Sequence, residues 1–184
     1  MMDISEWRRQ LEMEREEKDR FFKMSPQSPI SYEDRERFTG LDYYPVNLAY
    51  RFELKLYEHK EKKTIKMAFT KGNEQNFIRW GEFRFRTGEQ EQILQVYKKD
   101  PSEDMLFISF KDATSGKETY GAGRYIDLES ERDQTADGKW ILDFNKAYNP
   151  WCVFSEDYTC PLVPPENWLK IPIYAGEKNY PLKK

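Results

Sequence analysis

The sequence predicts a mainly β fold, an antiparallel β-barrel or sandwich preceded by an N-terminal amphipathic α-helix. Three observations predict it. Aromatic residues make up 16% of the 184 residues, and such side chains favour pleated, half-buried surfaces. Several short segments alternate apolar and polar residues with period two, as strands with one buried face do. Glycine, proline, asparagine and aspartate separate these segments at the spacing of an antiparallel β protein.

The first segment, from Ile4 to Phe22, is expected to form the helix. It has high helix propensity, and its opposite charges fall at helical spacing. Asp3 or Ser5 is expected to cap its N-terminus. Prolines at positions 26 and 29 cannot continue the helix. A thin apolar stripe should dock it, formed by Trp7, Leu11, Phe21 and Phe22.

The clearest strand is expected at residues 49–57. Its apolar side chains alternate with charged ones, so that one face is apolar. Because 184 residues are near the size of one domain, we assign residues 1–30 to the helix and a linker and residues 31–184 to a single β domain. Further strands are expected at residues 64–70, 82–86, 92–97, 105–110, 124–128, 140–145 and 171–175.

Composition and charge exclude several classes of partner. Lys and Arg together number 30 and Asp and Glu 33, for a net charge of -3, which lacks the basic excess typical of nucleic-acid or anionic-membrane binding. The first residues do not resemble a secretory signal, and no apolar run reaches membrane-spanning length. A cytoplasmic location is therefore expected. The sequence gives no indication of the oligomeric state.

The region that follows the regular strands is rich in polar connections and carries a family resemblance. The string DATSGKETYGAGRYIDLE is followed by DFNKAYNPWCVFSEDYTCPLVPPENWL and by PIYAGEK. These strings, with EKDRFFKMSPQSPI and GLDYYPVNLAYRF nearer the N-terminus, resemble the domain of unknown function 1684 family of bacterial and archaeal proteins. The resemblance covers nearly the whole chain, and it implies no activity.

Two polar segments, residues 112–124 and 143–167, are the candidate site. If strand pairing brings them together, their carboxylates could divide acid and base roles or bind a hard cation, and Arg124 could bind an anionic group. The alternative is turn chemistry, with Arg124 paired to a carboxylate such as Asp127 or Asp143. We assign catalytic roles to Asp112, Glu118, Asp143 and Tyr120, and ligand-binding roles to Thr114, Ser115, Arg124, Asn145, Tyr148, Asn149 and Glu166.

Other chemistries find little support in the sequence. Residues 115–117 lack the first glycine of a phosphate loop, and residues 121–123 lack the third glycine of the dinucleotide fingerprint. The single histidine, His59, is expected in a solvated turn far from Cys152 and Cys160, which argues against a metal site and against histidine-based nucleophilic catalysis. Structural thiols are the favoured interpretation of the two cysteines, ahead of a redox pair.

Two functions remain open at this point. The first is a small-molecule binding protein or a cofactor-independent hydrolase or lyase that uses the polar pocket, with no cofactor indicated. The second is a noncatalytic protein-interaction module in which the polar loops are structural. In that case exposed aromatic side chains would form the partner surface, namely Tyr43, Tyr44, Trp80 and Trp151.

Overall fold

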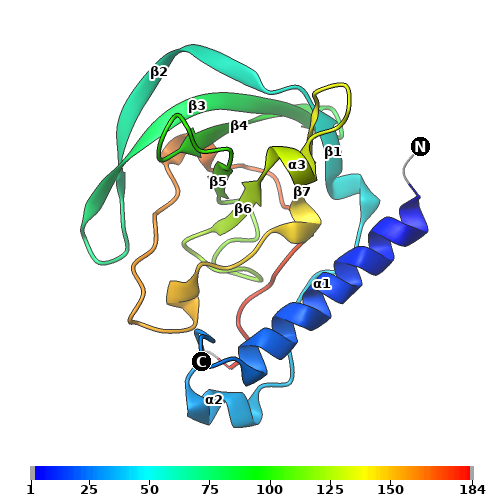
Figure 1. Cartoon of the computed structure of the whole chain (residues 1–184), viewed down its shortest axis with the longest axis vertical. Helices are drawn as coiled ribbons and strands as arrows, with labels where there is room; N and C mark the ends of the chain where they lie inside the picture. Colours follow the sequence, from blue (N-terminus) through cyan, green and yellow to red (C-terminus); the bar gives the residue numbers. More distant parts are fainter. Residues whose placement is uncertain (1–2, 183–184) are drawn as a thin grey trace.

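Helix α1 (Ile4–Met24) is the first element of the computed structural model, which describes residues 3–182. Asp3 caps it, because its side chain accepts hydrogen bonds from the backbone N–H groups of Ser5 and Glu6. Leu11 and Phe22 are buried, at 2% and 1% exposure. The predicted apolar stripe therefore docks the helix. In Figure 1, α1 runs along one side of the β structure.

Seven strands form two antiparallel sheets in the described part of the chain. The larger sheet has five strands in the order β2-β3-β4-β5-β6, and β1 pairs with β7 in the smaller one. Since β2 and β6 are the two edges of the larger sheet, the strands form no closed ring. The bounds are β1 (Arg51–Leu54), β2 (Tyr57–Ala68), β3 (Glu74–Thr87), β4 (Gln90–Lys98), β5 (Leu106–Phe110), β6 (Arg124–Leu128) and β7 (Trp140–Asp143).

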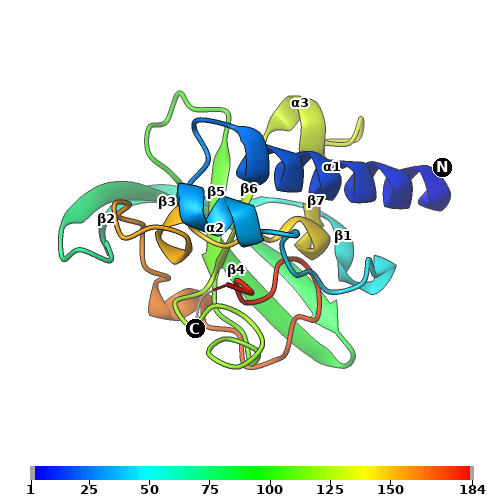
Figure 2. The same ribbon diagram turned by 90° about the horizontal axis from the view of Figure 1, so that it is seen from below.

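Short helices lie before β1, between β6 and β7, and after β7. The mainly β, antiparallel architecture with an N-terminal helix is confirmed, and Figure 2 shows α1 lying across the sheets when the molecule is turned. None of the helices in residues 3–182 combines the length and apolarity needed to span a membrane. The short helices are α2 (Tyr32–Arg37), α3 (Ser130–Asp133), η1 (Leu48–Tyr50), η2 (Phe144–Lys146), η3 (Trp151–Val153) and η4 (Pro165–Asn167).

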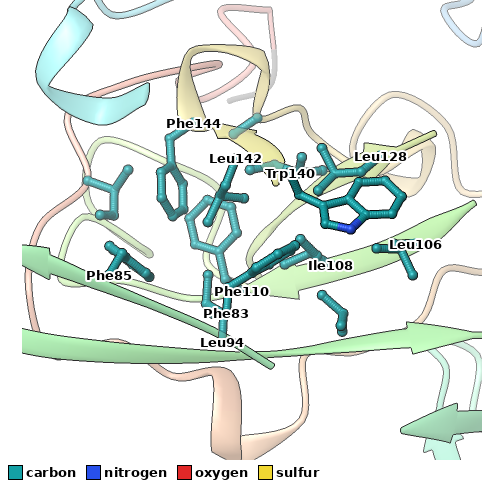
Figure 3. Close-up of a cluster of buried hydrophobic side chains, with 14 of the residues drawn as sticks. Phe83, Phe85, Leu94, Leu106, Ile108, Phe110, Leu128, Trp140, Leu142 and Phe144 are labelled. Carbon is teal, nitrogen blue, oxygen red and sulfur yellow. The ribbon is translucent and has the colours of Figure 1, made fainter. Parts of the chain in front are cut away.

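The main hydrophobic core lies between the larger sheet and the chain around β7 (Figure 3). The Phe144 ring packs against the rings of Phe85 and Phe110, with centroids 5.4 and 5.2 Å apart. Trp140 and Leu142 lie in the same cluster. Burying such side chains contributes about 1.5–3 kcal/mol each. This packing fixes β7, and with it the polar residues that follow.

Two expected strands are present with different bounds. Residues 49–57 contain the end of η1, then β1, then a break before β2. The alternation still identified the buried face correctly, because the side chains of Tyr50, Phe52, Leu54 and Leu56 all pack against the main core. The strand expected at residues 140–145 ends at Asp143, because the Asp143 side chain accepts a hydrogen bond from the Asn145 N–H and caps η2.

No strand forms at residues 171–175. The carbonyl groups of Ile173 and Ala175 accept hydrogen bonds from the guanidinium of Arg124 instead of from a neighbouring strand. His59 is also not in a turn: it lies within β2, and its Nε2 is 2.7 Å from the side-chain oxygen of Gln95. Alternation alone could not anticipate a side chain that substitutes for a strand.

Candidate functional site

The loop after β5 folds into a closed polar cluster around Arg124. Arg124 and Asp112 form an ion pair of 3.5 Å, and their side chains are 0% and 1% exposed. Asp112 also accepts hydrogen bonds from the hydroxyl groups of Thr114 and Ser115. The Thr114 hydroxyl in turn lies 2.9 Å from that of Thr119. We call Asp112, Thr114, Thr119 and Arg124 the Arg124 cluster.

The Arg124 cluster is saturated largely by the protein itself. Arg124 donates to the carbonyl oxygens of Ile173, Ala175 and Glu177, and only its Nε lacks a partner. Asp112 accepts a further 2.6 Å hydrogen bond from the Ile173 N–H. Burial lowers the pKa of Arg124, and the charge of Asp112 opposes that shift. The predicted partner carboxylate is therefore corrected: it is Asp112, not Asp127 or Asp143.

Asp143 and Asn145 take a different place, beside α1. One Asp143 oxygen accepts hydrogen bonds from the backbone and side-chain N–H groups of Asn145, and the other accepts a 2.8 Å bond from the Trp7 indole. The Asn145 side chain exchanges two hydrogen bonds of 2.9 Å with the backbone of Asn47. These contacts join the start of η2 to the helix and to the residues before η1.

The remaining candidates have separate partners. Glu118 is exposed and accepts a 2.5 Å hydrogen bond from the Tyr44 hydroxyl. Glu166 is also exposed, and it pairs with Arg79 at 2.9 Å and accepts from the Tyr97 hydroxyl. The Tyr120 hydroxyl lies 4.0 Å from the sulfur of Cys152. The 112–124 loop and the 143–167 segment thus supply side chains to several places.

A cleft of about 130 Å³ lies between α1 and the chain that follows β7. Two of the predicted ligand-binding residues, Asn145 and Tyr148, line it. In Figure 1, α1 passes beside the turn after β7 and the red C-terminal segment. We call this space the α1 cleft. Its lining consists of Leu11, Glu14, Arg15, Lys18, Tyr43, Asn145, Lys146, Ala147, Tyr148 and Glu177.

Glu177 is the buried anion of the α1 cleft. The residue is 1% exposed, and its carboxylate pairs with the ammonium of Lys18 and accepts a 2.8 Å hydrogen bond from the Asn149 N–H. The backbone carbonyl of the same residue accepts from Arg124. Glu177 therefore stands between the Arg124 cluster and the α1 cleft, with its main chain in one and its side chain in the other.

Arg15 is the cation of the cleft that has no carboxylate partner. Its guanidinium donates to the carbonyl oxygens of Tyr44 and Asn145 at 3.0 and 3.3 Å, and it lies 4.4 Å from the centre of the Tyr43 ring. Among residues 3–182 no carboxylate lies within ion-pair distance of it. Burial lowers the pKa of Arg15. Carbonyl dipoles and an aromatic face contact the charge directly, and the charges of Asp143, Glu12 and Glu177 oppose the pKa shift from farther away.

Two polar atoms of the cleft-lining side chains have no protein partner. They are Nε of Arg15 and the hydroxyl of Tyr43, and both are buried. Burial is the main cause that raises the pKa of Tyr43, followed by the charge of Glu177, so this hydroxyl stays protonated and can both donate and accept. Buried polar groups are normally paired. Arg15 and Tyr43 are thus lining residues that each keep one unpaired polar atom.

Sequence patterns did not identify Arg15, Lys18, Tyr43 and Glu177 as site residues. A signal for the first two was present, because Leu11, Arg15, Lys18 and Phe22 follow one another at intervals of four, three and four residues and so share one helix face. A charged side chain on the docking face of a helix lies against the protein, whereas one on the solvated face lies in water. Tyr43 was expected only in the exposed aromatic surface of an interaction module, and the sequence carries no comparable signal for Glu177.

The aromatic surface expected for an interaction module does not assemble as predicted. Tyr44 is 8% exposed and so is buried. The Trp80 ring lies between the ammonium groups of Lys62 and Lys98, at 4.0 and 4.2 Å from its centre. Trp151, at 37% exposure, is the exposed one of these rings.

Residues 3–182 contain no group of three or more His, Cys, Asp or Glu side chains arranged to hold a metal ion.

Comparison with known proteins gives a family and a structural relative. The family model described as "Protein of unknown function (DUF1684)" matches residues 36–178. A solution NMR structure of an uncharacterised protein of Haloarcula marismortui is 34% identical, covers 95% of each chain and has a TM-score of 0.72. No curated protein matches. The chain therefore belongs to the DUF1684 family of proteins of unknown function, as its strings indicated.

Proposed function

We propose that this protein binds a small organic anion, a carboxylate, in the α1 cleft. The observation that carries the proposal is Arg15, a half-buried guanidinium with no carboxylate partner in the described chain and with a free Nε. Guanidinium groups bind carboxylates through parallel N–H donors. The cleft lining has three cationic and two anionic side chains. A bound monoanion would balance the difference.

The size and lining of the cleft restrict the ligand. Its volume of about 130 Å³ lies below the range of roughly 300–1,000 Å³ typical of sites for drug-sized molecules. Leu11 and Ala147 supply apolar surface, and Tyr43 supplies an uncharged aromatic side chain. We therefore expect a short carboxylate with a small apolar body. The proposal is for binding, so the catalytic roles assigned to Asp112, Glu118, Asp143 and Tyr120 stay predictions on which it does not rest.

Thermal unfolding with added carboxylates tests the proposal. Formate, acetate, propionate, butyrate and succinate are added in turn to the wild-type protein, with chloride at equal ionic strength as the control. A ligand at 100 times its Kd stabilises the native state by about 2.7 kcal/mol, which corresponds to a rise in Tm of roughly 5–10 °C for a chain of this length. We expect at least one of acetate, propionate and butyrate to produce this rise.

Two arginine variants assign the effect to the cleft. Arg15→Gln removes the unpaired cation, and we expect it to abolish the rise in Tm. Arg8→Gln, at an exposed position of the same helix, has the same change of charge and should keep the rise. If no carboxylate raises the Tm of the wild-type protein, or if Arg15→Gln retains the full effect, the proposal is wrong.

A further inference from the structure

The two cysteines lie close together, Cys152 within η3 and Cys160 in the segment that follows it. Cys152 is partly exposed and Cys160 is 7% exposed. The backbone N–H of Cys152 donates to the sulfur of Cys160 at 3.3 Å. Since the N–Cα bond is about 1.46 Å long, the Cys160 sulfur lies within about 4.8 Å of the Cys152 Cα. The sulfur of Cys160 therefore lies beside the backbone of Cys152.

The surroundings of Cys160 favour its thiolate. The thiol of Cys152 and the backbone N–H groups of Cys152 and Trp151 lower the pKa of Cys160, although burial opposes the shift. Of these groups, the Cys152 N–H donates to the Cys160 sulfur at 3.3 Å. Donors aimed at a sulfur stabilise its anion, and the thiolate is the form that reacts. Cys160 thus has the character of a nucleophile, with a second thiol beside it.

A surface groove reaches this pair at Cys152. Cys152 lines a groove of about 290 Å³ together with Val153, Ser155 and Tyr180. The hydroxyl of Tyr120 lies 4.0 Å from the Cys152 sulfur. The groove is separate from the α1 cleft, because the two share no lining residue. A chemistry at the cysteines would therefore be independent of ligand binding in the cleft.

We infer that Cys152 and Cys160 form a dithiol that peroxides oxidise to an intramolecular disulfide. The Cys160 thiolate attacks one oxygen of hydrogen peroxide; an S–O bond forms, the O–O bond breaks, and the leaving hydroxide takes a proton to become water. The Cys152 sulfur then attacks the Cys160 sulfenic acid. The S–S bond forms, the S–O bond breaks, and hydroxide leaves with the proton of the Cys152 thiol. Two thiols and one peroxide give one disulfide and two waters.

The first experiment measures the product and the rate. The reduced native protein is treated with one equivalent of hydrogen peroxide at pH 7 and analysed by mass spectrometry after proteolysis without reduction. We expect a mass decrease of two hydrogen atoms and a peptide pair joined through residues 152 and 160. We expect thiol loss about tenfold faster than in the same chain unfolded in urea, because a thiol of ordinary pKa is mostly protonated at pH 7. Equal rates, or oxidation without this disulfide, would overturn the inference.

The second experiment assigns the two roles. Cys152→Ser leaves the nucleophile without the thiol that resolves it, so dimedone, which captures sulfenic acids, should label Cys160 after peroxide treatment. Cys160→Ser should show at least a fivefold smaller yield of label on Cys152. The circular dichroism spectrum of each variant checks its fold, and Cys→Ala variants replace any that does not fold. Greater labelling of Cys152 than of Cys160 would overturn the assignment of the nucleophile.

Discussion

The structure places two arginine side chains in different surroundings, with Arg124 fully buried and Arg15 half-buried. Arg124 donates to three main-chain carbonyls and pairs with Asp112, inside a cluster that is almost fully buried. Arg15 donates to two carbonyls, stacks on Tyr43 and has no carboxylate partner in the described chain. A buried guanidinium alone therefore does not mark a site. A guanidinium beside a cleft that forms no direct ion pair within residues 3–182 is the better candidate.

The largest expected effect comes from removing the guanidinium of Arg124. Arg124→Met leaves Asp112 buried without its cation, and breaking a buried pair in this way costs about 3–5 kcal/mol of unfolding free energy. Arg15→Met is the matched variant, and we expect it to cost only about 1 kcal/mol, since water can enter the cleft and hydrate the carbonyls. Urea unfolding followed by tryptophan fluorescence measures both.

The double variant Arg124→Met with Asp112→Asn tests whether the unpaired charge of Asp112 causes this loss of stability. It removes the uncompensated charge, so part of the lost stability should return. Similar costs for Arg124→Met and Arg15→Met would show that the Arg124 cluster is not the saturated structural unit that its contacts indicate.

Gly176 lies between Ala175, whose carbonyl accepts a hydrogen bond from Arg124, and Glu177, which lines the α1 cleft. Its substitution should have the next largest effect. It has a φ of +77°, and a Cβ placed on it would lie 2.7 Å from the carbonyl oxygens of Phe144 and Ala147. Gly176→Ala combines the strain of a left-handed conformation, about 1–2 kcal/mol, with overpacking of about 1–3 kcal/mol. We therefore expect a loss of about 3 kcal/mol.

Gly72→Ala is the control for this prediction. Gly72 has a φ of +84°, and a Cβ placed on it would have no atom within 4 Å, so only the conformational strain of about 1 kcal/mol is expected. Chemical unfolding compares the two variants. If they lose the same stability, the close approach of the chain at residues 144 and 147 does not constrain the wall of the cleft.

The smallest expected effect concerns Asp127, which accepts a hydrogen bond from Tyr148 of the cleft lining. Burial raises its pKa, while the hydroxyl of Tyr148, 2.5 Å away, opposes the shift. Because the native state holds this proton more tightly than the unfolded chain, the stability of the wild-type protein falls as the pH rises from about 4 through the native pKa. Asp127→Asn removes this dependence, so its stability relative to wild type should increase between pH 4 and pH 7.

Tyr148→Phe provides the opposite change for the same measurement. It removes the hydrogen bond that holds the pKa of Asp127 down, so the fall in stability between pH 4 and pH 7 should become steeper. Unfolding in urea at several pH values distinguishes the three proteins. Parallel pH profiles for wild type and Asp127→Asn would contradict the role of burial at this carboxylate.

The sequence by itself determined the docking stripe of α1, the buried faces of the strands and the polar character of residues 112–124. These follow from periodicity and turn chemistry, which act over a few neighbouring residues. The tertiary structure decided which polar groups meet. Arg124 was expected to bind an anionic ligand or, in the alternative, to pair with a carboxylate such as Asp127 or Asp143. It pairs instead with Asp112 and donates to the carbonyls of Ile173, Ala175 and Glu177.

The α1 cleft depended on tertiary structure even more. Arg15 and Glu177 are 162 positions apart in the sequence, and they line one space because the helix docks on the chain after β7. Local patterns carry no information on which distant segments will pack together, since that choice depends on shape, burial and charge over the whole fold. A sequence shows which residue types a site could use, but tertiary packing determines which of them become neighbours.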